Sequence, residues 1–188
     1  MSGASEQPGL FDVATPEPPP LREVLGPWAR MRRLAVVSDD RQYRYHMARQ
    51  WDDKLPPLGW VMLNPSTADH EKDDPTTVRV VNFSADWGYG SALVANLFAL
   101  RSSSPKLLTT SGLDPIGPAN AEAVRSLAGM DVVCAWGASI PDYYRHRGRA
   151  VRETLRCLGC TTYHLGMTAG GHPRHPLYLP STTELVRW

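Results

Sequence analysis

Short apolar segments alternate with helix-like segments along most of the chain. Buried strands are predicted where apolar runs end at a polar residue or glycine, namely at residues 59–63, 92–97, 132–137 and 161–165. Helices are predicted where apolar residues recur at helical spacing, namely from Pro75 to Gly88 or Gly90, at 118–128 and at 141–158. Alternating strands and helices are typical of a parallel sheet that is covered on both faces.

A β-hairpin is predicted upstream of this alternation. Residues 34–37 and 43–47 are rich in β-prone side chains and flank the Asp-rich segment 38–41. The sequence therefore predicts an α/β fold of three α/β/α layers, with a mainly parallel, four-stranded central sheet and an N-terminal antiparallel hairpin. We expect one domain over residues 28–188. Residues 1–27 are rich in proline and poor in apolar side chains, which predicts a disordered arm.

Composition excludes several classes of protein. The 188 residues carry a net charge of +1, so any contact with nucleic acid must come from a local basic patch. The sequence has neither an apolar run of roughly 20 residues nor a signal segment, so we expect a cytoplasmic protein without membrane contact. Cys134, Cys157 and Cys160 cannot all pair, and one C-x-x-C does not complete a zinc site. We expect both thiols of the C-x-x-C to pack in the core, and no cofactor.

The first candidate site directly follows the apolar run 59–63. Asn64 can donate and accept hydrogen bonds, Pro65 fixes the turn, and Ser66 adds a hydroxyl. Ligands of parallel sheets bind beyond the carboxyl ends of the strands, which favours a functional role for Asn64. Asp74, in contrast, is explained as the cap of the following helix.

Carboxylates are concentrated between this turn and the helix. Asp69 is a candidate general base, ranked below Asn64. A metal near Asp69 and Asp73 is an alternative because hard cations prefer such oxygens, but no calcium-loop pattern is present. We therefore predict no metal.

The second candidate site is the Gly/Pro-rich loop after the last predicted strand. His172, Arg174 and His175 offer donors suited to a phosphate or a polarised carbonyl. Each histidine precedes a proline, so no helix can align the two as metal ligands. The sheet rule places this loop on the same edge as Asn64 and Asn96. A rigid, purely structural loop is the other interpretation.

Two further patterns have both a structural and a functional interpretation. Arginines recur along one face of the helix predicted at 141–158. This face is either simply exposed to solvent or binds a phosphodiester backbone. The arginines are Arg145, Arg149, Arg152 and Arg156. In the N-terminal arm, Gln7 followed by Leu10 and Phe11 resembles the motif by which bacterial DNA-handling proteins bind the replication sliding clamp. The other interpretation is a stray apolar pair.

Five blocks of sequence resemble a bacterial and phage family known only as a domain of unknown function. In order, within residues 31–182, they are LNPSTADHEKDDPTTVRVVNFSADWGYG, VANLFALRSSSP, DPIGPAN, AWGA and GHPRHPLYLP. The order of strands, an Asn-Pro turn and a His-Pro loop is also similar to that of the uracil-DNA glycosylase superfamily. That resemblance implies a glycosylase-like version of the fold predicted above.

The resemblance to glycosylases implies specific roles. Asn64 would position or help activate the attacking water, and His175 would bind the base carbonyl with Leu177 as a wedge in the duplex. His172-Pro173 is the other possible match to the histidine motif. Ser66 stands where the superfamily usually has glycine, and Leu177 or Arg174 stands where it has serine. Uracil specificity is therefore not implied.

Together these patterns favour a protein that acts on a nucleic-acid base or nucleotide, in its concrete form a hydrolytic N-glycosidase. DNA or a nucleotide is the expected partner, and Trp136 is a candidate platform for the base. Two alternatives remain: a non-catalytic module that binds DNA or a modified base, and an enzyme acting on a small phosphorylated metabolite. The first interpretation requires Asn64 and His175 to line one cavity.

Overall fold

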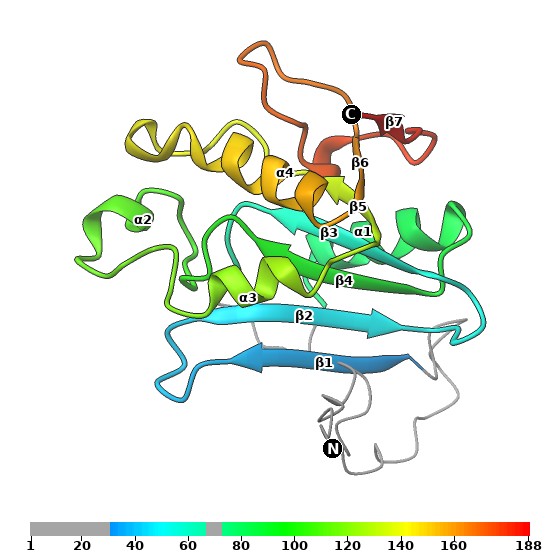
Figure 1. Ribbon diagram of the computed structural model, residues 1–188, viewed down its shortest axis with the longest axis horizontal. Helices are drawn as coiled ribbons and strands as arrows, with labels where there is room; N and C mark the ends of the chain where they lie inside the picture. The colour runs from blue at the N-terminus through cyan, green and yellow to red at the C-terminus, as the bar shows by residue number, and fades with distance from the viewer. Residues whose placement is uncertain (1–30, 67–72) are drawn as a thin grey trace, which may run out of the picture. The chain divides into compact units, whose positions relative to one another are not determined.

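The apolar runs form the centre of a mixed seven-stranded sheet in a computed structural model, which describes residues 31–66 and 73–188. The strands are β1 (Arg32–Val37), β2 (Arg44–Gln50), β3 (Pro57–Met62), β4 (Ser91–Asn96), β5 (Asp131–Cys134), β6 (Thr161–His164) and β7 (Val186–Arg187). Their order across the sheet is β1-β2-β4-β3-β5-β6-β7 (Figure 1). The predicted α/β class is thus confirmed.

The pairing of the strands separates a parallel centre from antiparallel edges. β3 runs parallel to β4 and β5, and β5 runs parallel to β6. The predicted hairpin of β1 and β2 is present, but it is not a separate element, because β2 pairs with β4 in antiparallel fashion. β7 extends the other edge against β6 and was not predicted, since two residues are too short to show a period.

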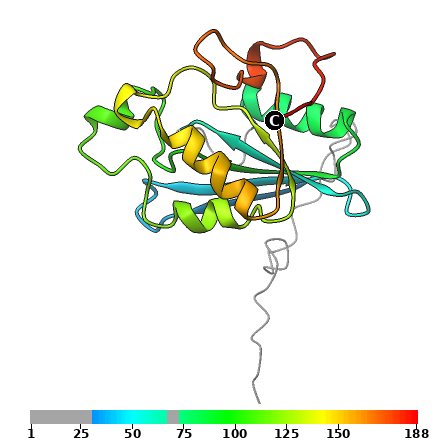
Figure 2. The ribbon, with the colours of Figure 1, turned by 45° about the horizontal axis from the view of Figure 1, so that its top comes forward.

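Helices cover both faces of the sheet. They are α1 (Pro75–Asp86), α2 (Leu107–Thr110), α3 (Asn120–Arg125) and α4 (Arg147–Cys157), with 3₁₀ turns η1 (Asp142–Tyr144) and η2 (Pro176–Tyr178). In Figure 1, α3 and α4 lie in front of the sheet and α1 lies behind it, and Figure 2 shows the same layers from another side. This arrangement buries the continuous apolar runs of β3, β4 and β5 on both sides.

Local sequence signals determine where α1 begins and ends. The Asp74 side chain accepts a hydrogen bond of 2.7 Å from the backbone N–H of Thr77, and Pro75 occupies the first turn. The helix ends before Gly88, whose φ of +85° suits a residue without a Cβ. Phe83 on its inner face is 1% exposed and belongs to the main apolar core.

The helix predicted at 141–158 is shorter in the structure. α4 begins at Arg147, after the separate turn η1. Tyr144 of that turn packs edge-on against Phe98 with ring centroids 5.2 Å apart, which holds the segment away from the helix axis. The expectation that both C-x-x-C thiols are buried is half wrong: Cys160 is buried, but Cys157 in the last turn of α4 is exposed.

Residues 31–188 form one compact unit, and the predicted arm of residues 1–27 lies outside the described residues. Within the described ranges, no helix is both long and apolar enough to cross a lipid bilayer.

His46 of β2 is a buried histidine between the sheet and α3. It is 7% exposed, and its Nε2 lies 3.2 Å from the Ser126 hydroxyl. Its Nδ1 is buried with no hydrogen-bond partner among the described residues. Burial disfavours the charged imidazolium and lowers the pKa of His46 to about 4. The folded protein therefore holds this ring neutral.

This burial predicts a loss of stability in mild acid. The unfolded chain binds a proton on His46 near pH 6.5, and the folded chain binds it only near pH 4, so stability falls as pH drops through this window. His46→Gln removes the titrating group and retains a partner for Ser126. Between pH 7 and pH 5, we expect the unfolding free energy of wild type to fall by about 2 kcal/mol more than that of the variant.

Urea unfolding at both pH values measures the effect. His146→Gln is the control because His146 is exposed, and it should follow the wild-type profile. Identical pH profiles for wild type and His46→Gln would contradict the prediction.

Candidate functional site

A cavity of about 580 Å³ opens at the edge of the sheet where the parallel strands end. The strands end level with one another, since Met62 of β3 is paired with Asn96 of β4 and Val61 of β3 with Cys134 of β5. Six of the residues that the sequence marked as candidates line the cavity: Asn64, Ser66, Asn96, Trp136, Arg174 and His175. The structure therefore brings the Asn-Pro turn and the His-Pro loop to one site.

Asn64 is held in a fixed orientation two residues after β3. Its Nδ2 donates to the backbone oxygens of Ser102 at 3.1 Å and Pro65 at 3.2 Å. These two carbonyls use the donor end of the amide. The Oδ1 is then the atom of this side chain that can accept a hydrogen bond from a water or a ligand.

His175 is likewise oriented by its own loop. Its Nδ1 accepts a hydrogen bond of 3.3 Å from the backbone N–H of Leu177 at the start of η2. The proton of the neutral ring therefore lies on Nε2. Burial lowers the pKa of His175, although the negative charge of Asp74 acts in the opposite direction. At neutral pH the ring is a neutral N–H donor.

The His-Pro loop is attached to the end of β5. The backbone N–H of Gly137 donates to the Pro173 carbonyl at 2.9 Å, and the backbone N–H of Arg174 donates to the Gly166 carbonyl at 2.9 Å. Gly137 has a φ of +73°, and a Cβ at this position would lie 3.4 Å from the Cβ of His175. The backbone thus holds His175 against the carboxyl edge of the sheet.

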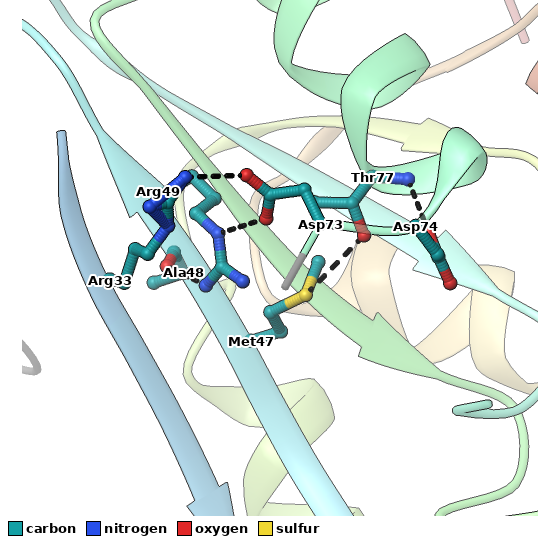
Figure 3. Close-up of polar contacts among 7 residues, drawn as sticks. All are labelled: Arg33, Met47, Ala48, Arg49, Asp73, Asp74 and Thr77. Carbon is teal, nitrogen blue, oxygen red and sulfur yellow. Dashed lines mark hydrogen bonds and ion pairs between the residues drawn. The ribbon is translucent and has the colours of Figure 1, made fainter. Parts of the chain in front are cut away.

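Asp74 combines a structural role with a place in the cavity lining. One carboxylate oxygen caps α1 through Thr77 (Figure 3). The other accepts a hydrogen bond of 3.2 Å from the Ser66 hydroxyl. The sequence explained this residue as a helix cap only. No signal in the sequence distinguishes a cap that faces solvent from one that faces a cavity, so its second role was missed.

The neighbouring Asp73 is held by two arginines. Its oxygens lie 2.8 Å from Nε of Arg49, which is 1% exposed, and 2.8 Å from Nη2 of Arg33 (Figure 3). This carboxylate is therefore committed to ion pairs rather than open to a metal. Across residues 31–66 and 73–188, no three or more His, Cys, Asp and Glu side chains gather in a way that would hold a metal ion. The candidate base Asp69 lies outside the described residues.

Arg44 lines the cavity because of an irregularity in β2. Val36 of β1 is paired with His46, and the next residue, Val37, is paired with Arg44, so Tyr45 is an extra, bulged residue. The bulge breaks the alternation of faces, and Arg44 joins Met47 in the cavity lining although three positions separate them. Strict alternation would place the two on opposite faces. Sequence periodicity could not reveal this.

The remaining candidates have other positions. Pro65, His172 and Leu177 are close in sequence to residues that line the cavity, but they do not line it themselves. On α4, the Arg152 guanidinium lies 4.1 Å from the ring centroid of Trp188, and Arg156 pairs with Glu153. Arg145 and Arg149 are exposed. The arginine stripe is therefore not one uniform basic surface.

The fold and cavity define an α/β protein whose candidate ligand site lies at the carboxyl edge of parallel strands. The chain belongs to the family described as "Protein of unknown function (DUF1643)", which matches residues 44–177. The match includes all six candidates that line the cavity. The expected membership of a family without assigned function is confirmed. No curated protein and no solved structure matches the chain, so the similarity to glycosylases is not supported by these comparisons.

The ion pairs of Asp73 predict a strong dependence of stability on this carboxylate. Asp73→Ala removes the negative charge that faces the buried Arg49 guanidinium, and we expect a loss of about 3 kcal/mol in unfolding free energy. Glu122→Ala removes the partner of Arg125 in an exposed pair and should cost less than about 1 kcal/mol. Urea titrations of both variants measure the difference. Equal small losses would contradict a stabilising role of Asp73.

Proposed function

We propose that this chain binds a nucleobase in the cavity at the sheet edge and hydrolyses the bond between that base and its sugar. The substrate class is a base in a nucleic acid or a nucleotide. The observation that carries the proposal is that Asn64 and His175, which are far apart in sequence, line one cavity. β3 runs parallel to its neighbours β4 and β5, and β5 runs parallel to β6. This arrangement supports a glycosylase-like fold, because it brings the Asn-Pro turn and the His-Pro loop to the same edge of the sheet.

Glycosidic hydrolysis needs stabilisation of the departing base. The C1′–N bond breaks, and its electron pair leaves with the base, which departs as an anion while the sugar becomes a cation. The Nε2–H of neutral His175 can donate to the carbonyl oxygen on which this charge accumulates. A neutral donor suits this role because it stabilises the anion without first having to be protonated.

The second requirement is a positioned water. The fixed Oδ1 of Asn64 can accept a hydrogen bond from the water and orient its lone pair towards C1′. The water oxygen bonds to C1′, and one of its protons is released. Asp74 is a carboxylate in the same cavity that can accept this proton. Asp74 then gives up the proton that it accepted, and the base anion takes up one proton, so that the carboxylate is restored and the products are a free base and a sugar hydroxyl.

Two aromatic residues, Trp136 and Tyr178, are among the residues that line the cavity. Trp136 is 3% exposed and lies in the lining, where contact with Gly148 and Trp188 fixes its ring. At the mouth, Tyr178 is 84% exposed and its ring centroid lies 6.1 Å from that of His175. Tyr178 is a better-exposed candidate than Leu177 for contact with a neighbouring base.

The proposal predicts that catalysis depends on Asn64 more than stability does. Asn64→Ala removes the oriented acceptor and should lower the rate of base release at least about 100-fold. Its unfolding free energy should fall by only about 1 kcal/mol, the net value of the lost hydrogen bonds. Free bases released from nucleosides, nucleotides, single strands and modified duplexes are measured by chromatography.

Gln42→Ala is the matched control, because it truncates an exposed amide outside the cavity lining and should retain the full rate. If wild type releases no base from any of these substrates, the catalytic proposal is overturned. Binding of DNA or a modified base without release would favour the non-catalytic module instead.

A further inference from the structure

Arg44 is the cavity-lining arginine whose guanidinium is partly buried. Nε of Arg44 is buried and has no hydrogen-bond partner among the described residues. No ion pair of Arg44 occurs in the described ranges, whereas Arg33, Arg125 and Arg156 each face a carboxylate there. A guanidinium nitrogen removed from water without a partner costs folding free energy. Nε of Arg79 and of Arg152 is likewise buried without a partner in the described residues, but of these three arginines only Arg44 lines the cavity.

The surroundings of Arg44 increase this cost rather than relieve it. Burial, together with the positive charge of Arg101, lowers the pKa of Arg44 to about 10, and the charge of Asp74 opposes this shift only in part. Asp74 itself is engaged by Thr77 and Ser66. The guanidinium stays charged at neutral pH because its pKa remains well above 7.

Among the described residues, positive charges outnumber negative ones in the cavity lining. These residues include two arginines, Arg44 and Arg174, and one carboxylate, that of Asp74. The hydroxyls of Ser103 and Thr76 are further donors in the lining. Arginine favours phosphoryl oxygens, because its planar fork can donate two parallel hydrogen bonds to them.

The size of the cavity is also relevant. A volume of about 580 Å³ falls within the range of roughly 300–1,000 Å³ that is usual for small-molecule sites. A single nucleobase would fill only part of it. The remaining space can hold a sugar with a phosphoryl group.

We propose that Arg44 binds a phosphoryl group of the ligand, so that the substrate of this site is a nucleotide rather than a bare base or nucleoside. The nucleotide part of this proposal rests on the proposed function. The phosphoryl subsite rests on Arg44 and the cavity lining around it, not on the identity of the base, and can be tested separately.

The test compares ligands with and without phosphate on wild type and on Arg44→Met. The probes are the common nucleosides, their 5′-monophosphates, a short oligonucleotide and inorganic phosphate, with affinities from calorimetry. Wild type should bind at least one monophosphate at least about tenfold more tightly than its nucleoside. Arg44→Met should lose that tenfold advantage and retain the affinity for the nucleoside. Arg125→Gln, an equal change in charge on an exposed residue of α3, should change neither affinity.

Stability of the ligand-free variant distinguishes a ligand-binding residue from a structural one. Arg44 is a partly buried cation whose Nε has no hydrogen-bond partner among the described residues. Replacing it by an unbranched apolar side chain should leave the melting temperature of Arg44→Met unchanged or raise it. If Arg44→Met does not fold, or melts well below wild type, Arg44 is structural and the proposal is overturned. Arg44→Lys keeps the charge but not the planar fork. If Arg44 is structural, Arg44→Lys should bind monophosphates as tightly as wild type; if Arg44 binds the phosphoryl group, it should bind them more weakly.

The outcomes separate the two proposals. Equal affinities of nucleosides and monophosphates, unchanged in Arg44→Met, overturn the phosphoryl subsite while base binding stands. Binding of inorganic phosphate that is lost in Arg44→Met, without affinity for any nucleoside or nucleotide, supports the subsite and overturns the nucleobase function. The oligonucleotide could instead bind more tightly than every monophosphate, with an affinity that depends on Arg44. That result would identify an internal phosphodiester as the source of the phosphoryl group and overturn the assignment to a nucleotide.

Discussion

Parallel pairing of β3 with β4 and β5, and of β5 with β6, is the constraint on which the site depends. Parallel strands that end level with one another must deliver the segments after them to one edge of the sheet. Asn64 follows β3, Trp136 follows β5, and His175 lies in the loop after β6. Each of these side chains reaches the cavity because of the hydrogen-bond register of the sheet, not because of any direct attraction between them.

Several polar groups at this edge are fixed by the backbone around them. Carbonyl oxygens hold the amide nitrogen of Asn64, and a backbone N–H fixes the tautomer of His175. Such preorganisation avoids reorienting these groups during a reaction. Arg44 differs from these two residues, because its Nε lacks any such partner among the described residues. Its desolvation has a cost in stability that a bound anion would offset.

Much of this arrangement could be predicted from the sequence. Continuous apolar runs marked the four central strands, and the cap at Asp74 with Pro75 marked the start of α1, because these signals are local. The break before α4 and the exposure of Cys157 depend on packing between distant segments and were not predicted. Arg44 was missed for a similar reason, since the bulge at Tyr45 appears only when β1 and β2 are paired.

The central claim is that Asn64 and His175 act on one ligand in one cavity. A double-mutant cycle tests it most directly, with the affinity for a bound nucleotide measured for Asn64→Ala, His175→Ala and the double variant. The account predicts that each single variant weakens binding and that the two effects are non-additive by at least about 0.5 kcal/mol, as expected for groups that contact a common ligand. Strictly additive effects, or no effect of either variant, would contradict it.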